Sequence, residues 1–228
     1  MRSSVVNPAS DPPKLPFRAY LFDLDGTLID SVELILRSYR HTVELHLGSV
    51  PPDEVWLEGM GTPLWRQLAA FSEDAQVVEA MIATYRDYNR RHHDHLVGEF
   101  PGARQAVETL RDCGAKLGVV TSKRRASARR GLAICGLEGI FPVVIGADDV
   151  DRHKPDPTPV LRALEELGVE ASETIFIGDS PHDLAAGRAA GVSTGAALWG
   201  PIARHLLEPH QPDYWLEHPS DIVTLGGV

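Results

Sequence analysis

The sequence is poor in cysteine, and none of its hydrophobic runs is long. Its 228 residues include two cysteines, Cys113 and Cys135, too few for the disulfide framework of a small secreted domain. We interpret both as small apolar core residues in a reducing compartment. No apolar run approaches the roughly 20 residues that a membrane-spanning helix needs, so we expect no contact with a membrane.

Positive charge is also scarce. The chain has 22 lysine and arginine residues against 32 aspartate and glutamate residues, which gives a formal net charge of −10. This charge opposes non-specific binding, so we expect no nucleic-acid partner. An anionic substrate would need a locally positive site or a metal ion.

Residues 1–16 lack the apolar segment of a signal peptide and contain four prolines. We predict a flexible tail there and a cytoplasmic location for the protein. The sequence leaves the oligomeric state open between a monomer and a homodimer.

Short apolar runs alternate with amphipathic segments along most of the chain. Two of the amphipathic segments are followed by Gly114 and Gly168, and glycine is typical just beyond the end of a helix. Alternation of strands and helices predicts an α/β fold with a doubly wound parallel sheet. The expected strands cover residues 18–24, 116–122, 143–147, 174–178, 192–198 and 214–216.

Residues 30–98 interrupt this alternation because they contain no clear strand. Val78, Ile82 and Tyr85 recur there at helical spacing. Asp30 with Glu33 predicts an N-cap pair for the first helix of this segment. The segment is therefore expected to be entirely helical.

These patterns divide the chain into two predicted parts. Residues 17–29 and 99–228 form an α/β core, and residues 30–98 form a helical cap. Because the cap follows the first strand directly, we expect it to cover the ligand-binding end of the sheet as a lid.

The sequence DLDGTL at residues 23–28 follows the first apolar run. Asp23 and Asp25 are two positions apart, so their side chains point to the same side of an extended chain. Gly26 then permits a sharp turn. The two acids thus stand at the carboxyl end of a strand, where one could attack a phosphorus atom and the other could transfer a proton.

Two further sets of polar residues follow later strands. Thr121, Ser122 and Lys123 end the second expected strand, where a hydroxyl can hold a phosphoryl oxygen, although such a residue often only caps the next helix. Lys154 lies in a proline-rich loop after the third. It could neutralise a phosphoryl group, although most lysines are solvated surface residues.

Asp179 and Asp183 follow the fourth expected strand in the sequence GDSPHD. Their carboxylates could converge on a cation, and oxygen ligands without a nearby thiolate favour Mg²⁺ over zinc. The alternative for Asp183 is an N-terminal cap on the helix expected at residues 181–190. The four motifs arrive in a fixed order at strand ends, and their combination is far more specific than any one of them.

The combination resembles the haloacid dehalogenase (HAD) superfamily phosphatases. The resemblance runs from about residue 17 to the C-terminus, and residues 30–98 are similar to the helical C1 cap of that superfamily. Within the superfamily, GMGTPL at residues 59–64 and KPDP at residues 154–157 are similar to phosphoglycolate phosphatases and their pyrophosphatase relatives.

The resemblance implies a role for each residue. Asp23 would be the nucleophile, and Asp25 would protonate the leaving oxygen and then activate water. Asp23, the backbone carbonyl of Asp25 and Asp179 would hold Mg²⁺, with Asp183 assisting directly or through water. Thr121 and Lys154 would bind the phosphoryl group. Apart from the resemblance, we expect Ser122 and Lys123, which directly follow Thr121, to bind the substrate as well.

We therefore expect a Mg²⁺-dependent phosphatase that hydrolyses a small phosphorylated metabolite through an aspartyl-phosphate. Phosphoglycolate is the first choice of substrate, and pyrophosphate or a sugar phosphate follows. Asp25 supports this choice because dehalogenating and phosphonate-cleaving relatives lack the second acid. Two alternatives stay open, a sugar phosphomutase of the same superfamily and a non-enzymatic phosphoacceptor or sensing module.

Three other features of the sequence carry expectations. Two glycines in residues 59–62 allow a close backbone approach, so we expect Gly61 and Thr62 to reach the site and help to select the substrate. The basic run at residues 123–130 is interpreted as a solvated helix face that adds positive potential near the substrate. The cap core is expected to contain Trp56, Trp65, Tyr85 and Tyr88. The cluster of His92, His93 and His95 is interpreted as the polar end of a cap helix.

Overall fold

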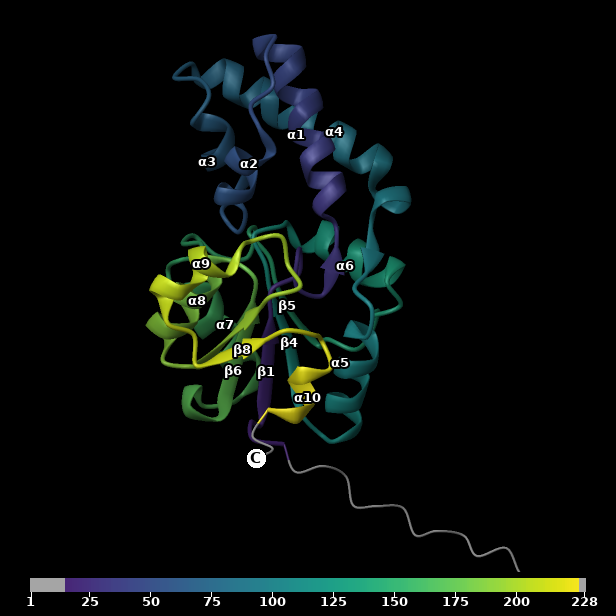
Figure 1. Cartoon of the computed structure of the whole chain (residues 1–228), viewed down its shortest axis with the longest axis vertical. Coiled ribbons are helices and arrows are strands. Elements are labelled where there is room, and N and C mark those ends of the chain that lie inside the picture. The colour runs from purple at the N-terminus through teal and green to yellow at the C-terminus, as the bar shows by residue number, and fades with distance from the viewer. Residues whose placement is uncertain (1–14, 226–228) are drawn as a thin grey trace, which may run out of the picture.

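The computed structural model describes residues 15–225, so the predicted tail lies almost entirely outside the described residues. The core is a six-stranded parallel sheet in the order β5-β4-β1-β6-β7-β8 (Figure 1). The chain runs outward from β1 in one direction and then returns to its other side, so the switch point lies between β1 and β6. The strands are β1 (Ala19–Phe22), β4 (Lys116–Val120), β5 (Val143–Ile145), β6 (Thr174–Gly178), β7 (Ser193–Ala197) and β8 (Tyr214–Leu216).

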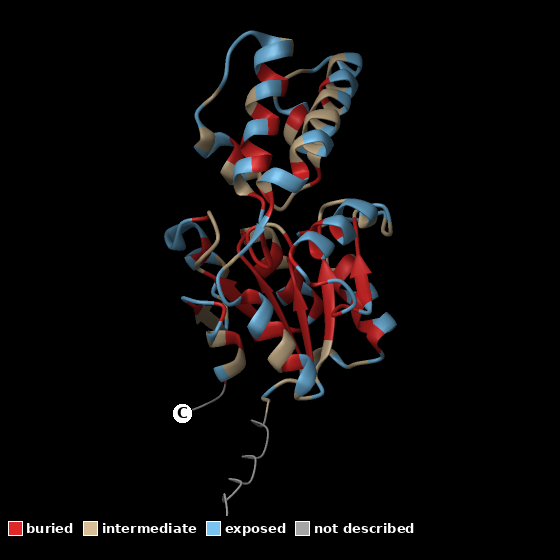
Figure 2. Ribbon diagram, turned by 90° about the vertical axis from the view of Figure 1, so that its right-hand side faces the viewer, coloured by how far each residue is buried: buried red, intermediate tan, exposed pale blue. Residues whose placement is uncertain are grey.

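Helices cover both faces of the sheet, as expected for a doubly wound fold. Tyr20 and Phe22 of β1 pack on one face with the α5 and α6 side, and Leu21 packs on the other with the α7 and α8 side. The sheet is therefore buried on both faces (Figure 2), which explains why its strands read as continuous apolar runs. The helices of the core are α5 (Ala103–Asp112), α6 (Arg125–Ile134), α7 (Thr158–Leu167), α8 (Pro181–Ala190), α9 (Arg204–Leu207) and α10 (Asp221–Thr224), with short 3₁₀ turns at Ala171–Glu173 and Glu208–His210.

Four helices form an insert beyond the carboxyl end of the sheet (Figure 1). They are α1 (Val32–Leu47), α2 (Asp53–Gly59), α3 (Leu64–Ala69) and α4 (Ala75–Leu96). The ring of Trp56 stacks on that of Tyr39 at a centroid distance of 4.5 Å, and both side chains are buried. None of the described helices is long and apolar enough to cross a membrane.

The expectation that residues 30–98 contain no strand is wrong at both ends of the insert. β2 (Ile29–Asp30) and β3 (Gly98–Glu99) pair as antiparallel strands and connect the insert to the core. Each has only two residues, too few to show a periodicity in the sequence. The predicted N-cap is displaced by one residue. Ser31 directly precedes α1 and makes no side-chain capping bond, whereas Oδ1 of Asp30 accepts from the N–H of Val32, the first residue of the helix (3.3 Å).

Two further expectations about the insert are wrong. Trp65 is 52% exposed rather than part of the core. His93 is buried where a polar helix end was expected, because α4 turns this residue toward Gly131 of α6. Both errors depend on how the helices rotate against their neighbours, which helical spacing alone does not determine.

Candidate active site

The segment after β1 turns sharply at the carboxyl end of the sheet. The backbone N–H of Asp23 still donates to Ile177 of β6 (2.8 Å), and the chain then reverses so that Gly26 N–H donates to the carbonyl of Ile29 (3.0 Å). Gly26 has φ of +82°, and a Cβ at this position would lie 2.4 Å from Oδ2 of Asp179. Glycine is therefore required both by the turn and by the close approach of the acid.

Three buried carboxylates meet at this end of the sheet. Oxygens of Asp23, Asp179 and Asp183 lie within 4.8 Å of one another. Asp23 follows β1 and Asp179 follows β6, while Asp183 is the third residue of α8. Asp183 also caps α8, since its Oδ2 accepts from Ser180 N–H (3.1 Å) and Ser180 Oγ (2.6 Å). Asp183 therefore caps α8, as one interpretation of the sequence predicted, and also lies among the clustered acids.

Lys154 places one positive charge among these acids. Its Nζ donates to Oδ1 of Asp23 (2.8 Å), to Oδ1 of Asp183 (2.5 Å) and to the carbonyl of Val120 (3.3 Å). Burial opposes the charge on Lys154, but Asp183 and Asp23 outweigh it and raise its pKa. Lys154 is therefore a buried cation that donates to two of the three clustered carboxylates.

One lysine does not balance three buried acids. Burial, followed by repulsion from Asp183, raises the pKa of Asp23 to about 7, although Lys154 acts in the opposite direction. Burial and the charges of Asp23 and Asp183 also raise the pKa of Asp179 well above its usual range. The three carboxylates thus have too little positive charge near them, and a cation beside them would stabilise their ionised forms.

The surroundings of Asp179 fit a hard cation. Its Oδ1 accepts from Thr27 Oγ1 (2.9 Å), whereas its buried Oδ2 has no hydrogen-bond partner in the described part of the chain. A Cβ at Gly200 would lie 2.4 Å from the Cβ of Asp179, so the acid is tightly enclosed. An orphaned carboxylate oxygen in an all-oxygen cluster is a suitable ligand for Mg²⁺. Asp183, by contrast, uses both oxygens on Lys154 and Ser180.

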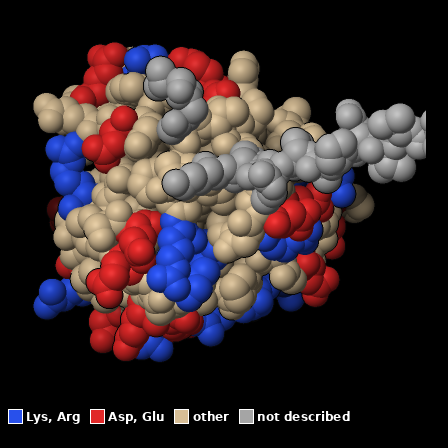
Figure 3. All heavy atoms as spheres, turned by 90° about the horizontal axis from the view of Figure 1, so that it is seen from below, with Lys and Arg blue, Asp and Glu red and all other residues tan. Residues whose placement is uncertain are grey.

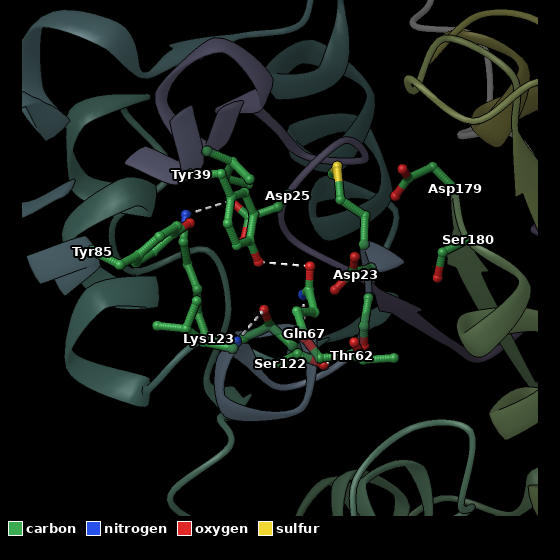
Figure 4. Close-up of a pocket in the computed structure, with 15 residues that line it drawn as sticks. Asp23, Asp25, Tyr39, Thr62, Gln67, Tyr85, Ser122, Lys123, Asp179 and Ser180 are labelled. Carbon is green, nitrogen blue, oxygen red and sulfur yellow. Dashed lines mark hydrogen bonds and ion pairs between the residues drawn. The ribbon is translucent and has the colours of Figure 1, made fainter. Parts of the chain in front are cut away.

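Asp25 has its own environment, apart from the three clustered acids. Its Oδ1 accepts hydrogen bonds from Ser31, just before α1, and from Lys123, just after β4. Figure 4 shows Lys123 reaching toward Asp25 across the pocket. The two contacts hold this carboxylate at the junction of core and insert.

The predicted substrate-binding residues fall into two groups. Thr121 is buried at the end of β4, where its Oγ1 accepts from Lys123 N–H (3.2 Å). Ser122 Oγ donates to the carbonyl of Gly61 (2.5 Å), so the loop of residues 59–62 reaches the core. The hydroxyl of Thr62 donates within that loop, to the carbonyl of Gly59 (2.8 Å).

These residues surround a cavity of about 80 Å³ between the core and the insert (Figure 4). Lys154 and Asp183 do not line it. Lys154 donates to Asp23, and Asp183 in turn accepts from Lys154. The core side of the cavity is formed by Asp23, Asp25, Thr121, Ser122, Lys123, Asp179 and Ser180, and the insert side by Ile35, Tyr39, Met60, Gly61, Thr62, Leu64, Gln67 and Tyr85.

Sequence reasoning missed several residues of this site. Thr27 and Ser180 stand inside the motifs, and their hydroxyl groups could have been noticed. Nothing in the sequence pointed to Ser31 or Gln67, since the position of each side chain depends on how the insert packs against the core. Tyr85 was assigned to the core of the insert, yet it lines the cavity.

Comparison with known proteins agrees with this geometry. The profile of the family described as haloacid dehalogenase-like hydrolase matches residues 20–197. A protein of Caldanaerobacter subterraneus subsp. tengcongensis, provisionally named pyrophosphatase PpaX, is 43% identical over 199 residues, or 87% of this chain and 90% of that protein. Pyrophosphatase PpaX of Bacillus velezensis is 40% identical over 210 residues, or 92% of this chain and 96% of that protein.

Solved structures share the fold over nearly the whole chain. A crystal structure from Lactobacillus plantarum, provisionally named a phosphoglycolate phosphatase, is 29% identical and superposes with a TM-score of 0.81. The superposition covers 92% of this chain and 100% of that chain. The match therefore includes the insert as well as the sheet. The chain belongs to the haloacid dehalogenase-like hydrolase family.

Proposed function

We propose that the protein is a Mg²⁺-dependent phosphohydrolase that cleaves a small phosphate anhydride or ester through an aspartyl-phosphate on Asp23. The observation that carries this proposal is the position of Asp23, which lines the cavity while Lys154 holds its Oδ1. Asp25, on the same cavity wall, is positioned by Ser31 and Lys123. A nucleophile and a separate proton-transfer group thus face one small space.

The reaction follows from these two carboxylates. Asp23 attacks the phosphorus atom, and the bond to the leaving oxygen breaks as Asp25 gives that oxygen a proton. Asp25 then takes a proton from water, which attacks the phosphorus and releases orthophosphate with Asp23 restored. Thr121 lines the cavity from the end of β4 and is placed to bind a phosphoryl oxygen.

Asp23 and Asp179 are the residues that would hold Mg²⁺, with Asp183 in support. The ion would supply charge stabilisation for the transferring phosphoryl group. Lys154 adds a fixed positive charge beneath the nucleophile, independent of any ion.

Among substrates, we propose pyrophosphate first and phosphoglycolate second, which reverses the order expected from the sequence. The relatives named pyrophosphatase are 40% and 43% identical, whereas the structure named a phosphoglycolate phosphatase is 29% identical. The small cavity suits either molecule. The insert, whose loop at residues 59–62 closes the cavity, would act as the cap that selects between them.

The test is release of orthophosphate from pyrophosphate, phosphoglycolate and an aryl phosphate in the presence of Mg²⁺. We expect hydrolysis of all three, with the highest kcat/KM for pyrophosphate, and loss of all activity in Asp23→Asn. An equally active Asp23→Asn protein would refute the mechanism. Isomerisation of a sugar phosphate without release of phosphate would instead identify a mutase.

A further inference from the structure

A second and larger cavity lies beside the active site, between the insert and the core. Its volume is about 710 Å³, and it meets the small cavity at Leu64, Ser122 and Lys123. One wall is formed by α4 and the segment Pro63 to Trp65, and the other by the start of α6 and the loops after β4 and β5. We call this cavity the basic groove.

The charge of the basic groove is opposite to that of the whole chain. The chain carries a net charge of −10, yet Asp148 is the one acid in the lining. At the lower end of the molecule as drawn in Figure 1, by contrast, acidic and basic side chains are intermixed (Figure 3). Five basic residues line the groove: Arg86, Arg90, Lys123, Arg124 and Arg130.

Several of these cations have acidic partners, and one does not. Arg90 pairs with Asp87 (2.8 Å) and Arg130 with Asp94 (2.8 Å), and Arg124 lies 3.6 Å from Asp148. Arg86 is exposed and forms no ion pair among residues 15–225. An anion that enters the groove therefore meets at least one uncompensated guanidinium group.

The backbone adds donors to the same wall. α6 begins at Arg125, and its N-cap residue Arg124 makes no side-chain capping bond. Ala126 and Ser127, in the first turn of this helix, line the groove. The N–H of Arg125, the first of the helix, donates to Oδ1 of Asp148 (2.7 Å). The positive end of the helix dipole adds to the attraction for an anion on this wall.

The connection to the active site decides which anion fits. A phosphoryl group beside Asp23 has a mostly apolar or aromatic wall above it, from Ile35, Tyr39, Met60 and Tyr85. The polar way out passes Ser122 and Lys123, which line both cavities. A neutral leaving group would form no ion pairs with the basic residues along that route, whereas a chain of phosphoryl groups would.

We propose that the basic groove binds the distal phosphoryl groups of a linear condensed phosphate whose terminal group is transferred to Asp23. This inference rests on the proposed function and extends its substrate class to inorganic oligophosphates. With tripolyphosphate, the terminal P–O–P bond breaks as Asp23 binds the terminal phosphorus, and pyrophosphate leaves with a proton from Asp25. Hydrolysis then yields orthophosphate, so the sum is tripolyphosphate plus water giving pyrophosphate and orthophosphate.

The test compares Arg86→Glu with the matched control Arg111→Glu, an exposed arginine of α5 outside the groove. For Arg86→Glu we expect KM for tripolyphosphate to rise about tenfold, the effect of losing one charge-assisted contact. The kcat/KM for an aryl phosphate, which has no distal phosphate, should stay within about twofold in both variants. A parallel loss on both substrates, or no change on tripolyphosphate, would overturn the proposal.

A binding measurement separates this inference from the proposed function. Calorimetric titration of tripolyphosphate into each protein in EDTA should show weaker binding for Arg86→Glu than for the wild type and Arg111→Glu. Equal affinities would refute the groove even in an active phosphatase. If the wild type hydrolysed no phosphate at all, the proposed function would fail, and the titration would still decide the binding site.

Discussion

The core and the insert contribute to the site in different ways. The core places Asp23, Asp179, Asp183 and Lys154 through buried strand ends and direct ion pairs. The insert touches the site through few polar contacts, such as the carbonyl of Gly61 on Ser122. We propose from this difference that the core determines the chemistry, while the insert determines which molecules reach it.

The sharpest way to test the role of the core is to remove its buried cation. Lys154→Met leaves Asp23 and Asp183 without their shared partner, which we expect to cost about 3–5 kcal/mol of unfolding free energy. Urea unfolding followed by circular dichroism would measure it. Lys116→Met, at the start of β4, is a control because that lysine is part-buried and donates to a carbonyl. A Lys154→Met protein as stable as this control would contradict the role of the core ion pairs.

Binding of Mg²⁺ to the acids of the core should raise the Tm of the protein, and the size of this rise should depend on pH. The raised pKa values of Asp23 and Asp179 mean that the metal-free folded protein binds more protons than the unfolded chain between about pH 4 and 7. Their contribution to stability is therefore present at low pH and lost as the pH rises through about 7. Because Mg²⁺ needs ionised ligands, it should raise Tm more at pH 8 than at pH 5.5.

Differential scanning calorimetry with Mg²⁺ and with EDTA would measure this difference. Asp179→Asn is expected to remove most of it, since Oδ2 of Asp179 is the orphaned oxygen of the cluster. An equal shift in Tm at the two pH values would show that Mg²⁺ binds elsewhere.

The insert can be tested at Gly61, where its loop lies against the core. Gly61 has φ of +90°, and a Cβ there would lie 2.5 Å from Ser180 Oγ. Gly61→Val should push the loop away and raise KM for pyrophosphate about tenfold, with a smaller effect on kcat. Steady-state kinetics would show the division between the two constants.

Gly48→Val separates strain from contact in this experiment. Gly48 also has positive φ, +70°, but a Cβ there meets nothing within 4 Å. It should therefore share the backbone strain of Gly61→Val, about 1–2 kcal/mol, without the change in KM. The same kinetics for both variants would remove the loop from substrate selection.

The smallest expected effect concerns a single hydrogen bond between the two parts. Ser122→Ala removes the bond to the carbonyl of Gly61, which contributes about 1 kcal/mol. We expect KM to rise by a few-fold while kcat for the aryl phosphate is retained. A large fall in kcat would show instead that Ser122 touches the reacting phosphoryl group.

The fold of the core could be predicted because local and global signals agree there. Strands buried on both faces read as apolar runs, and the acids at their carboxyl ends had to share one edge of the sheet. The position of Lys154 beneath Asp23 and Asp183, rather than on the cavity wall, could not be read from the sequence. A lysine in a loop has no periodicity, and the loop alone determines where its amine lies.

The insert was less predictable because its function depends on contacts between parts. Asp30 had the residue type of a helix cap, but it pairs in β2, and Ser31 uses its hydroxyl on Asp25 instead of on α1. The basic run at residues 123–130 was expected to be a solvated face. Four of its members form ion pairs with acids that are distant in the sequence: Lys123 with Asp25, Arg124 with Asp148, Arg125 with Asp149 and Arg130 with Asp94.

The paired strands β2 and β3 have a mechanical consequence. Because the two crossings between core and insert are hydrogen-bonded to each other, they form a single hinge, and the four helices should swing about it as one body. Ser31 leaves that hinge and bonds to Asp25. In the mechanism that we propose, opening the insert for product release would also separate Asp25 from this hydroxyl, so Asp25 would be oriented for proton transfer only in the closed form.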